Sequence, residues 1–234
     1  MPSRPHFAVA LSTAALLLAQ PLLAFDSPLS DEAVREAYFL GQRHDDSFVR
    51  ALDKYTTYLD PPETGPHIAS VTFFTPFALL VQSSSQHATG YSAQQAALDH
   101  RHQKETVKII VEIRLTASYG PFTVRRTGTR SDSPQGFVPR PYDFWKDFDV
   151  RVISGDKAGA DTGDDSSDAK EIRPISSDGQ PNVFCPDDGG CELSGATLTF
   201  EFLAEDFTSG SATVLVTPPE GDPVAVTFDL ADLR

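Results

Sequence analysis

Two cysteines have the spacing that most clearly predicts a chemical bond. Cys185 and Cys191 are the only cysteines of the chain and stand six residues apart, in the run Cys-Pro-Asp-Asp-Gly-Gly-Cys. The Asp-Asp-Gly-Gly run can turn tightly enough to bring the two sulfurs together, so we predict a disulfide. A redox centre would favour a Cys-x-x-Cys motif, and a zinc site would need more thiolates or a nearby histidine pair.

A proline-stiffened segment at 137–145 carries the residue types that dominate protein interfaces. It reads Phe-Val-Pro-Arg-Pro-Tyr-Asp-Phe-Trp, and Tyr, Trp and Arg are enriched among interface hot spots. The candidate binding residues are Arg140, Tyr142, Phe144 and Trp145. A second interpretation is favoured for two of them: Phe144 and Trp145 lead into a strand and fill the core, as the single Trp of a β-sandwich usually does.

An acidic stretch at 155–180 is a candidate for calcium binding. Ca²⁺ is bound by several carboxylates that converge in one loop, and the candidates are Asp156, Asp161, Asp164, Asp165 and Asp168. An EF-hand register that begins at Asp164 puts Ala169 where glycine is required and Ile175 where glutamate is required. We therefore predict a solvated acidic loop and no cofactor, with Ca²⁺ binding as the less favoured alternative.

Histidines and serines give no strong hydrolase pattern. His100 and His102 stand two residues apart, and side chains at this spacing lie on the same face only in a strand. The local pattern predicts a helix end instead, where the two side chains point apart. The chain lacks Gly-x-Ser-x-Gly, and Ser-Gly-Ser at 209–211 lies in a turn between predicted strands. His44, His67 and His87 could each pair with a distant serine, but the sequence does not single one out. An enzyme is therefore the less favoured interpretation.

The first 24 residues have the order of parts expected of a cleavable signal peptide. A short basic start containing Arg4 precedes an apolar run from Phe7 to Ala19, and Ala24 supplies a small residue before the cut. The apolar run is shorter than the roughly 20 residues that span a bilayer. We predict a secreted or periplasmic protein with no membrane insertion after cleavage; the alternative is an uncleaved anchor that extends to Phe25.

Composition narrows the partner class. The chain has 234 residues, 40% of them hydrophobic, and a formal net charge of −14. So acidic a chain is repelled by phosphate backbones, which disfavours nucleic acid. We therefore predict a partner that is a protein or a glycan, of unknown identity.

Residues 25–64 are predicted to be a helical N-terminal segment. Ser30 can cap a helix whose first turn holds Asp31 and Glu32. Asp45 or Asp46 can cap a second helix that continues to Leu59, where Asp60-Pro61-Pro62 stops it.

Residues 65–234 are predicted to be mainly strands. The apolar run 68–82 suggests a central strand with a bend at Pro76, covered on one face by the preceding helices. A further helix is capped by Ser92, and the clearest strand alternation is at 107–115. Shorter strands follow at 122–126, 148–153, 198–203, 212–216 and 224–230. The 24-residue connection before 107 has the length of a parallel crossover.

These elements predict an α+β fold with an antiparallel β-sandwich core, immunoglobulin-like or related. The N-terminal helical segment and one further helix cover part of a sheet. The predicted function is that of an exported, non-catalytic protein with a binding, scaffolding or envelope-associated role. The alternative is a secreted hydrolase whose site is assembled from scattered His and carboxylate residues.

Overall fold

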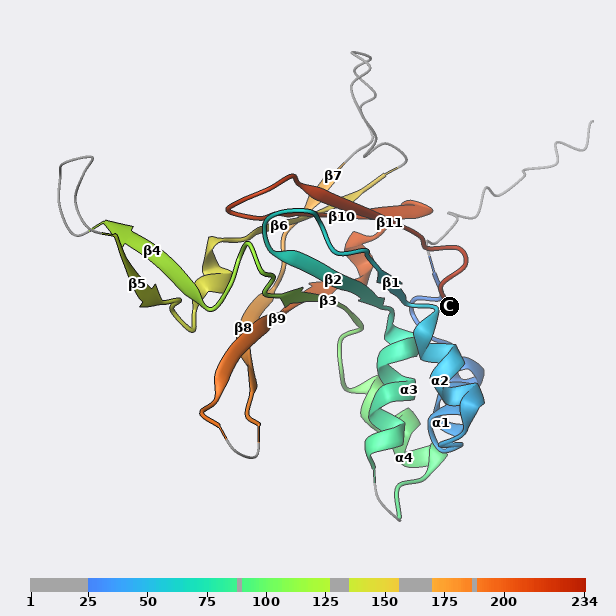
Figure 1. Ribbon diagram of the computed structural model, residues 1–234. Coiled ribbons are helices and arrows are strands. Elements are labelled where there is room, and N and C mark those ends of the chain that lie inside the picture. The colour runs from blue at the N-terminus through green and yellow to red at the C-terminus, as the bar shows by residue number, and fades with distance from the viewer. Residues whose placement is uncertain (1–24, 88–89, 127–134, 156–169, 187–188) are drawn as a thin grey trace, which may run out of the picture.

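The computed structural model describes residues 25–87, 90–126, 135–155, 170–186 and 189–234. Within these ranges the chain is a mixed α+β protein in which strands pair antiparallel throughout (Figure 1). None of the helices in these ranges is long and apolar enough to cross a membrane. The predicted signal peptide, residues 1–24, lies outside the described residues.

Eleven strands of the described chain form three sheets. The five-stranded sheet has the order β1 (Thr56–Tyr58), β2 (His67–Phe74), β3 (Thr106–Arg114), β9 (Glu192–Leu203) and β8 (Ser176–Phe184). The four-stranded sheet has the order β11 (Val224–Asp229), β10 (Ser211–Thr217), β6 (Asp149–Ser154) and β7 (Lys170–Ile172). The third is a two-stranded ribbon of β4 (Phe122–Arg126) and β5 (Gln135–Pro139).

The main core is built from side chains of the two larger sheets. Both contribute to one buried hydrophobic cluster, and the rings of Phe73 on β2 and Phe228 on β11 are 5.4 Å apart. The alternation predicted for β3 is confirmed, since Val107, Ile109, Val111 and Ile113 are fully buried. Burial of each such side chain contributes about 1.5–3 kcal/mol of hydrophobic free energy.

The four α-helices of the described chain lie together at one end of the sheets (Figure 1). They are α1 (Asp31–Gly41), α2 (Asp46–Asp53), α3 (Pro76–Gln86) and α4 (Ala93–Arg101). A second, smaller core packs α1 against α3 through Ala33, Val34, Ala37, Phe77 and Val81. The predicted caps Ser30, Asp45 and Ser92 are confirmed, each accepting backbone N–H bonds from the first turn of its helix.

The predicted strand over 68–82 is wrong beyond Phe74. Thr75 accepts the N–H of Ala78 as an N-cap, and Pro76 occupies the first turn of α3, where its missing N–H costs nothing. The predicted second helix is also too long, because α2 ends at Asp53 and residues 56–58 form β1. The helices therefore pack mainly on one another, and the expected cover over β2 is not observed.

Two further expectations change. The connection from β2 to β3 is not a parallel crossover, because these strands pair antiparallel, with Phe73 opposite Ile109. The acidic loop predicted over 155–180 is wrong at its C-terminal end, because Lys170–Ile172 is β7 and β8 begins at Ser176; residues 156–169 lie outside the described residues. The hairpin predicted around Pro218-Pro219 is confirmed by the pairing of β10 with β11.

Candidate functional site

The β4–β5 ribbon exposes phenylalanine side chains on one face. Phe122 and Phe137 are 56% and 79% exposed. Phe122 lies opposite Pro139, and Phe137 lies two residues before Pro139. Side chains of cross-strand partners and of alternate residues share a face. The two rings therefore stand on the same side of the ribbon, which projects away from the larger sheets (Figure 1).

The base of this ribbon is fixed to the core by Arg140. The Arg140 guanidinium stacks 3.5 Å from the ring centre of Tyr119, and its Nε donates to the Gly120 carbonyl at 2.8 Å. The Arg140 backbone N–H donates to the Pro121 carbonyl at 2.7 Å. Tyr119 is itself buried in the main core, and that burial is the main reason that its pKa is raised. The chain thus enters and leaves the ribbon through one anchored point.

The four candidate binding residues of segment 137–145 differ in how far they are buried. Tyr142 is 60% exposed, whereas Phe144 is buried in the main core. Trp145 packs over Gly179 of β8, so closely that a Cβ at Gly179 would lie 2.5 Å from the indole. Phe144 and Trp145 therefore pack in or against the core, as the second interpretation has it. Arg140 holds the base of the ribbon. Tyr142, from the predicted set, remains available to a partner.

Phe122 was not among the predicted binding residues. Its strand is separated from β5 by eight residues rich in Thr, Ser, Gly and Arg, a composition typical of a hairpin connection. That signal could have paired 122–126 with 135–139 and placed Phe122 beside Phe137.

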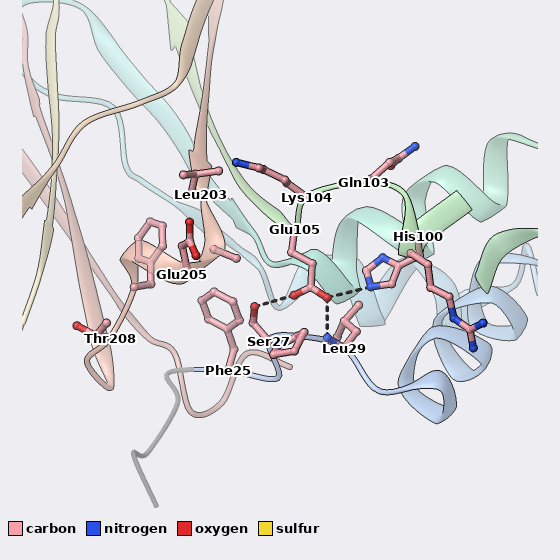
Figure 2. Close-up of a pocket in the computed structure, with 14 residues that line it drawn as sticks. Phe25, Ser27, Leu29, His100, Gln103, Lys104, Glu105, Leu203, Glu205 and Thr208 are labelled. Atoms are coloured by element: carbon pink, nitrogen blue, oxygen red, sulfur yellow. Dashed lines mark hydrogen bonds and ion pairs between the residues drawn. The ribbon is translucent and has the colours of Figure 1, made fainter. Parts of the chain in front are cut away.

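A cleft beside Glu105, which we call the Glu105 cleft, is the second candidate site (Figure 2). Its volume is about 660 Å³, within the range of small-molecule sites. The walls come from the N-terminal strap (residues 25–30), the α4–β3 connection and the short 3₁₀-helix η2 (Ala204–Asp206) after β9. The lining side chains are those of Phe25, Ser27, Pro28, Leu29, His100, Arg101, Gln103, Lys104, Glu105, Leu203, Ala204, Glu205, Phe207 and Thr208.

The Glu105 carboxylate accepts three hydrogen bonds in this cleft (Figure 2). The donors are Ser27 Oγ at 2.6 Å, the Leu29 N–H at 2.6 Å and His100 Nε2 at 2.9 Å. The Glu105 side chain is 12% exposed. Burial acts to raise the pKa of Glu105, but these donors outweigh it and hold the pKa below its usual value. Glu105 therefore joins the strap to the start of β3 as an anion.

The arrangement of Ser27, Glu105 and His100 differs from that of a hydrolytic triad. In a triad the serine bonds the histidine, which takes its proton, and the carboxylate lies behind the histidine. Here Ser27 donates to the carboxylate, so Ser27 and His100 are both partners of Glu105. His67 bonds the Leu59 carbonyl, and His87 bonds the Ser83 carbonyl. The contacts of these histidines therefore give the hydrolase alternative no support.

The metal candidates are divided between described and undescribed residues. Asp156, Asp161, Asp164, Asp165 and Asp168 lie outside the described residues. Within the described ranges, no group of three or more His, Cys, Asp or Glu side chains has the geometry to hold a metal ion. His102 ends α4 as its C-cap, and His100 is bonded to Glu105.

The predicted disulfide is confirmed. Cys185 and Cys191 are bonded, and they join the end of β8 to the start of β9. The neighbouring Phe184 is exposed, so the covalent bond ties together a hairpin end that has little packing of its own.

No family model matches the chain, and no curated protein matches it. The candidate sites therefore rest on the residues and contacts described above.

Proposed function

We propose that this is an exported, non-catalytic binding protein that presents the β4–β5 ribbon to a partner. The observation that carries the proposal is the pair of exposed rings, Phe122 and Phe137, on one face of a ribbon whose base is fixed by Arg140. Exposed aromatic side chains on a pre-positioned backbone are typical of recognition surfaces, because little conformational freedom is lost on binding. Tyr142 adds a ring with a hydrogen-bonding group.

A protein partner fits this surface better than a glycan. The phenylalanine rings of Phe122 and Phe137 have no polar group, so they complement an apolar patch rather than sugar hydroxyls. The proposed compartment is secreted or periplasmic. The Cys185–Cys191 disulfide supports it, because such bonds persist in oxidising compartments.

The proposal includes a sandwich of the immunoglobulin-like or related kind as the platform for the ribbon. Support comes from the antiparallel pairing in both larger sheets and from the single core that they share. In such a sandwich, recognition is carried by loops and hairpins at the ends of the sheets.

The binding proposal is tested by affinity capture, with the purified native protein as bait and the envelope and extracellular fractions of its source cells as the sample. The wild type is compared with the double variant Phe122→Ser/Phe137→Ser. The control is Phe39→Ser, because Phe39 on α1 is also 56% exposed. We expect one defined protein to be captured by the wild type and the control but lost with the ribbon variant. Capture of a polysaccharide instead of a protein would show that the partner is a glycan and that the choice of a protein partner is wrong. Equal capture by all three proteins would contradict the ribbon as the binding surface.

Export is tested separately by intact-mass measurement of the native protein. The expected mass is that of a chain beginning at or near Phe25, with no free thiol. A chain beginning at Met1 with two free thiols would contradict export.

A further inference from the structure

The Glu105 cleft has apolar walls that come from two segments far apart in the sequence. Phe25 and Leu29 of the strap face Leu203 and Phe207 near the end of β9. The rings of Phe25 and Phe207 are 6.2 Å apart and belong to the main core. A molecule in the cleft would therefore contact the edge of the core itself, and apolar contact would be the main source of its affinity.

The ionised groups around the cleft are of both signs, and two of them already have partners in the protein. Glu105 has the three donors described above, and Arg101 is bonded to both carboxylate oxygens of Asp31, at 2.7 and 2.9 Å. The Ala204 N–H donates to the Glu105 carbonyl at 3.1 Å. Lys104 and Glu205 also line the cleft, with opposite charges (Figure 2). The lining therefore carries ionised groups of both signs.

From the apolar walls and the mixed charges of the lining we propose that the Glu105 cleft binds a small, neutral, apolar molecule. A charged ligand of either sign would lose its hydration and would meet like charges as well as opposite ones, which is costly next to apolar walls. A neutral ligand loses little on entering and gains contact with Leu203 and with the exposed edges of Phe25 and Phe207. Polar side chains at Gln103 and Thr208 are available for one or two hydrogen bonds. This site is separate from the β4–β5 ribbon, and it does not depend on the proposed partner.

The proposal is tested with the fluorescent probe N-phenyl-1-naphthylamine, which is neutral and apolar, added to the purified native protein. We expect a saturable rise in fluorescence with a dissociation constant of about 0.1 mM or tighter. The related anionic probe 8-anilinonaphthalene-1-sulfonate should bind at least fivefold more weakly. Tighter binding of the anion than of the neutral probe would overturn the assignment of a neutral ligand.

Two variants place the probe in the cleft. Thr208→Phe fills the space at an exposed lining position, and Leu203→Lys adds an unpaired charge to the wall. Each should weaken binding of the neutral probe at least tenfold. Thr199→Phe, on the outer face of β9, is the matched control and should bind as the wild type does. Circular dichroism and thermal unfolding establish that each variant is folded.

The exposed ribbon could also attract an apolar probe, and Phe122→Ser/Phe137→Ser separates the two sites. If the cleft is the binding site, this ribbon variant keeps the full fluorescence rise. If the rise disappears with the ribbon rings and persists in folded Thr208→Phe and Leu203→Lys, the cleft proposal is wrong. Absence of any saturable rise with the wild type would also contradict it.

Discussion

The Leu29 backbone N–H donates to the Glu105 carboxylate at 2.6 Å, across 76 residues of sequence. The bond ties the strap to the residue that precedes β3, and Ser27 and His100 bond the same carboxylate. One acidic side chain thus fixes the strap, the end of α4 and a wall of the cleft. The first two predictions concern Glu105.

Glu105→Gln should destabilise the fold by about 1–3 kcal/mol, because a partly buried anion with three donors is replaced by an amide. The amide nitrogen is itself a donor and cannot accept from Leu29 or His100. Urea unfolding at neutral pH measures the loss. Glu201→Gln is the control, because Glu201 accepts one long bond from Ser176 at 3.3 Å, and a change below about 0.5 kcal/mol is expected. Equal losses for the two variants would contradict the role of Glu105.

Acid should remove the contribution of Glu105. Its pKa is lower in the folded protein than the value of about 4.3 for an unfolded chain. The contribution is therefore complete above about pH 4.3 and is lost as the pH falls through the folded value. The gap in unfolding free energy between wild type and Glu105→Gln should narrow from neutral pH to about pH 3. A gap that stays constant over this range would show that the ionised form of Glu105 is not what stabilises the strap.

Gly179→Ala should displace the single tryptophan. A Cβ at Gly179 would lie 2.5–2.6 Å from atoms of the Trp145 ring, so the indole must move away from β8. We expect a cost of about 1–3 kcal/mol and a red shift of the tryptophan emission. Gly210→Ala is the control, since a Cβ there meets nothing within 4 Å. An unchanged emission spectrum in Gly179→Ala would contradict the packing of Trp145 on β8.

Arg140→Lys should loosen the ribbon while keeping the positive charge. Lysine lacks the planar guanidinium that stacks on Tyr119 and bonds the Gly120 carbonyl. Amide hydrogen exchange in β4 and β5 should become several times faster, with a stability loss of about 1 kcal/mol. Arg151→Lys, whose ion pair with Asp149 is exposed, should leave the exchange of these strands unchanged. Unchanged exchange in Arg140→Lys would show that the ribbon is held by other contacts.

Elements specified by local signals were predictable from the sequence. The caps Ser30 and Ser92 and the alternation of β3 depend on residues within one or two turns or along one strand, and the structure has them in place. The disulfide was predictable for the same reason, since its six-residue spacing is local.

Elements decided by competing or distant signals were not predictable in the same way. The apolar run 68–82 is typical of a central strand, yet Thr75-Pro76 is also a helix start, and packing on α1 favours the helix after Phe74. Residues 137–145 are rich in proline, which favours a loop, and this signal competes with the pairing of 122–126 with 135–139. The bonds of Glu105 to Ser27 and Leu29 span more than 70 residues, so no local pattern announces them.

Site-specific photo-crosslinking in the native cells tests the binding function most directly. A benzoyl-phenylalanine replaces Phe137 on the ribbon in one strain and Phe39 on α1 in another; both natural side chains are exposed. The account predicts one discrete crosslinked species at 137, with the mass of this chain plus one protein partner, and none at 39. The same crosslinked species at both positions, or none at 137, would contradict the ribbon as a binding surface.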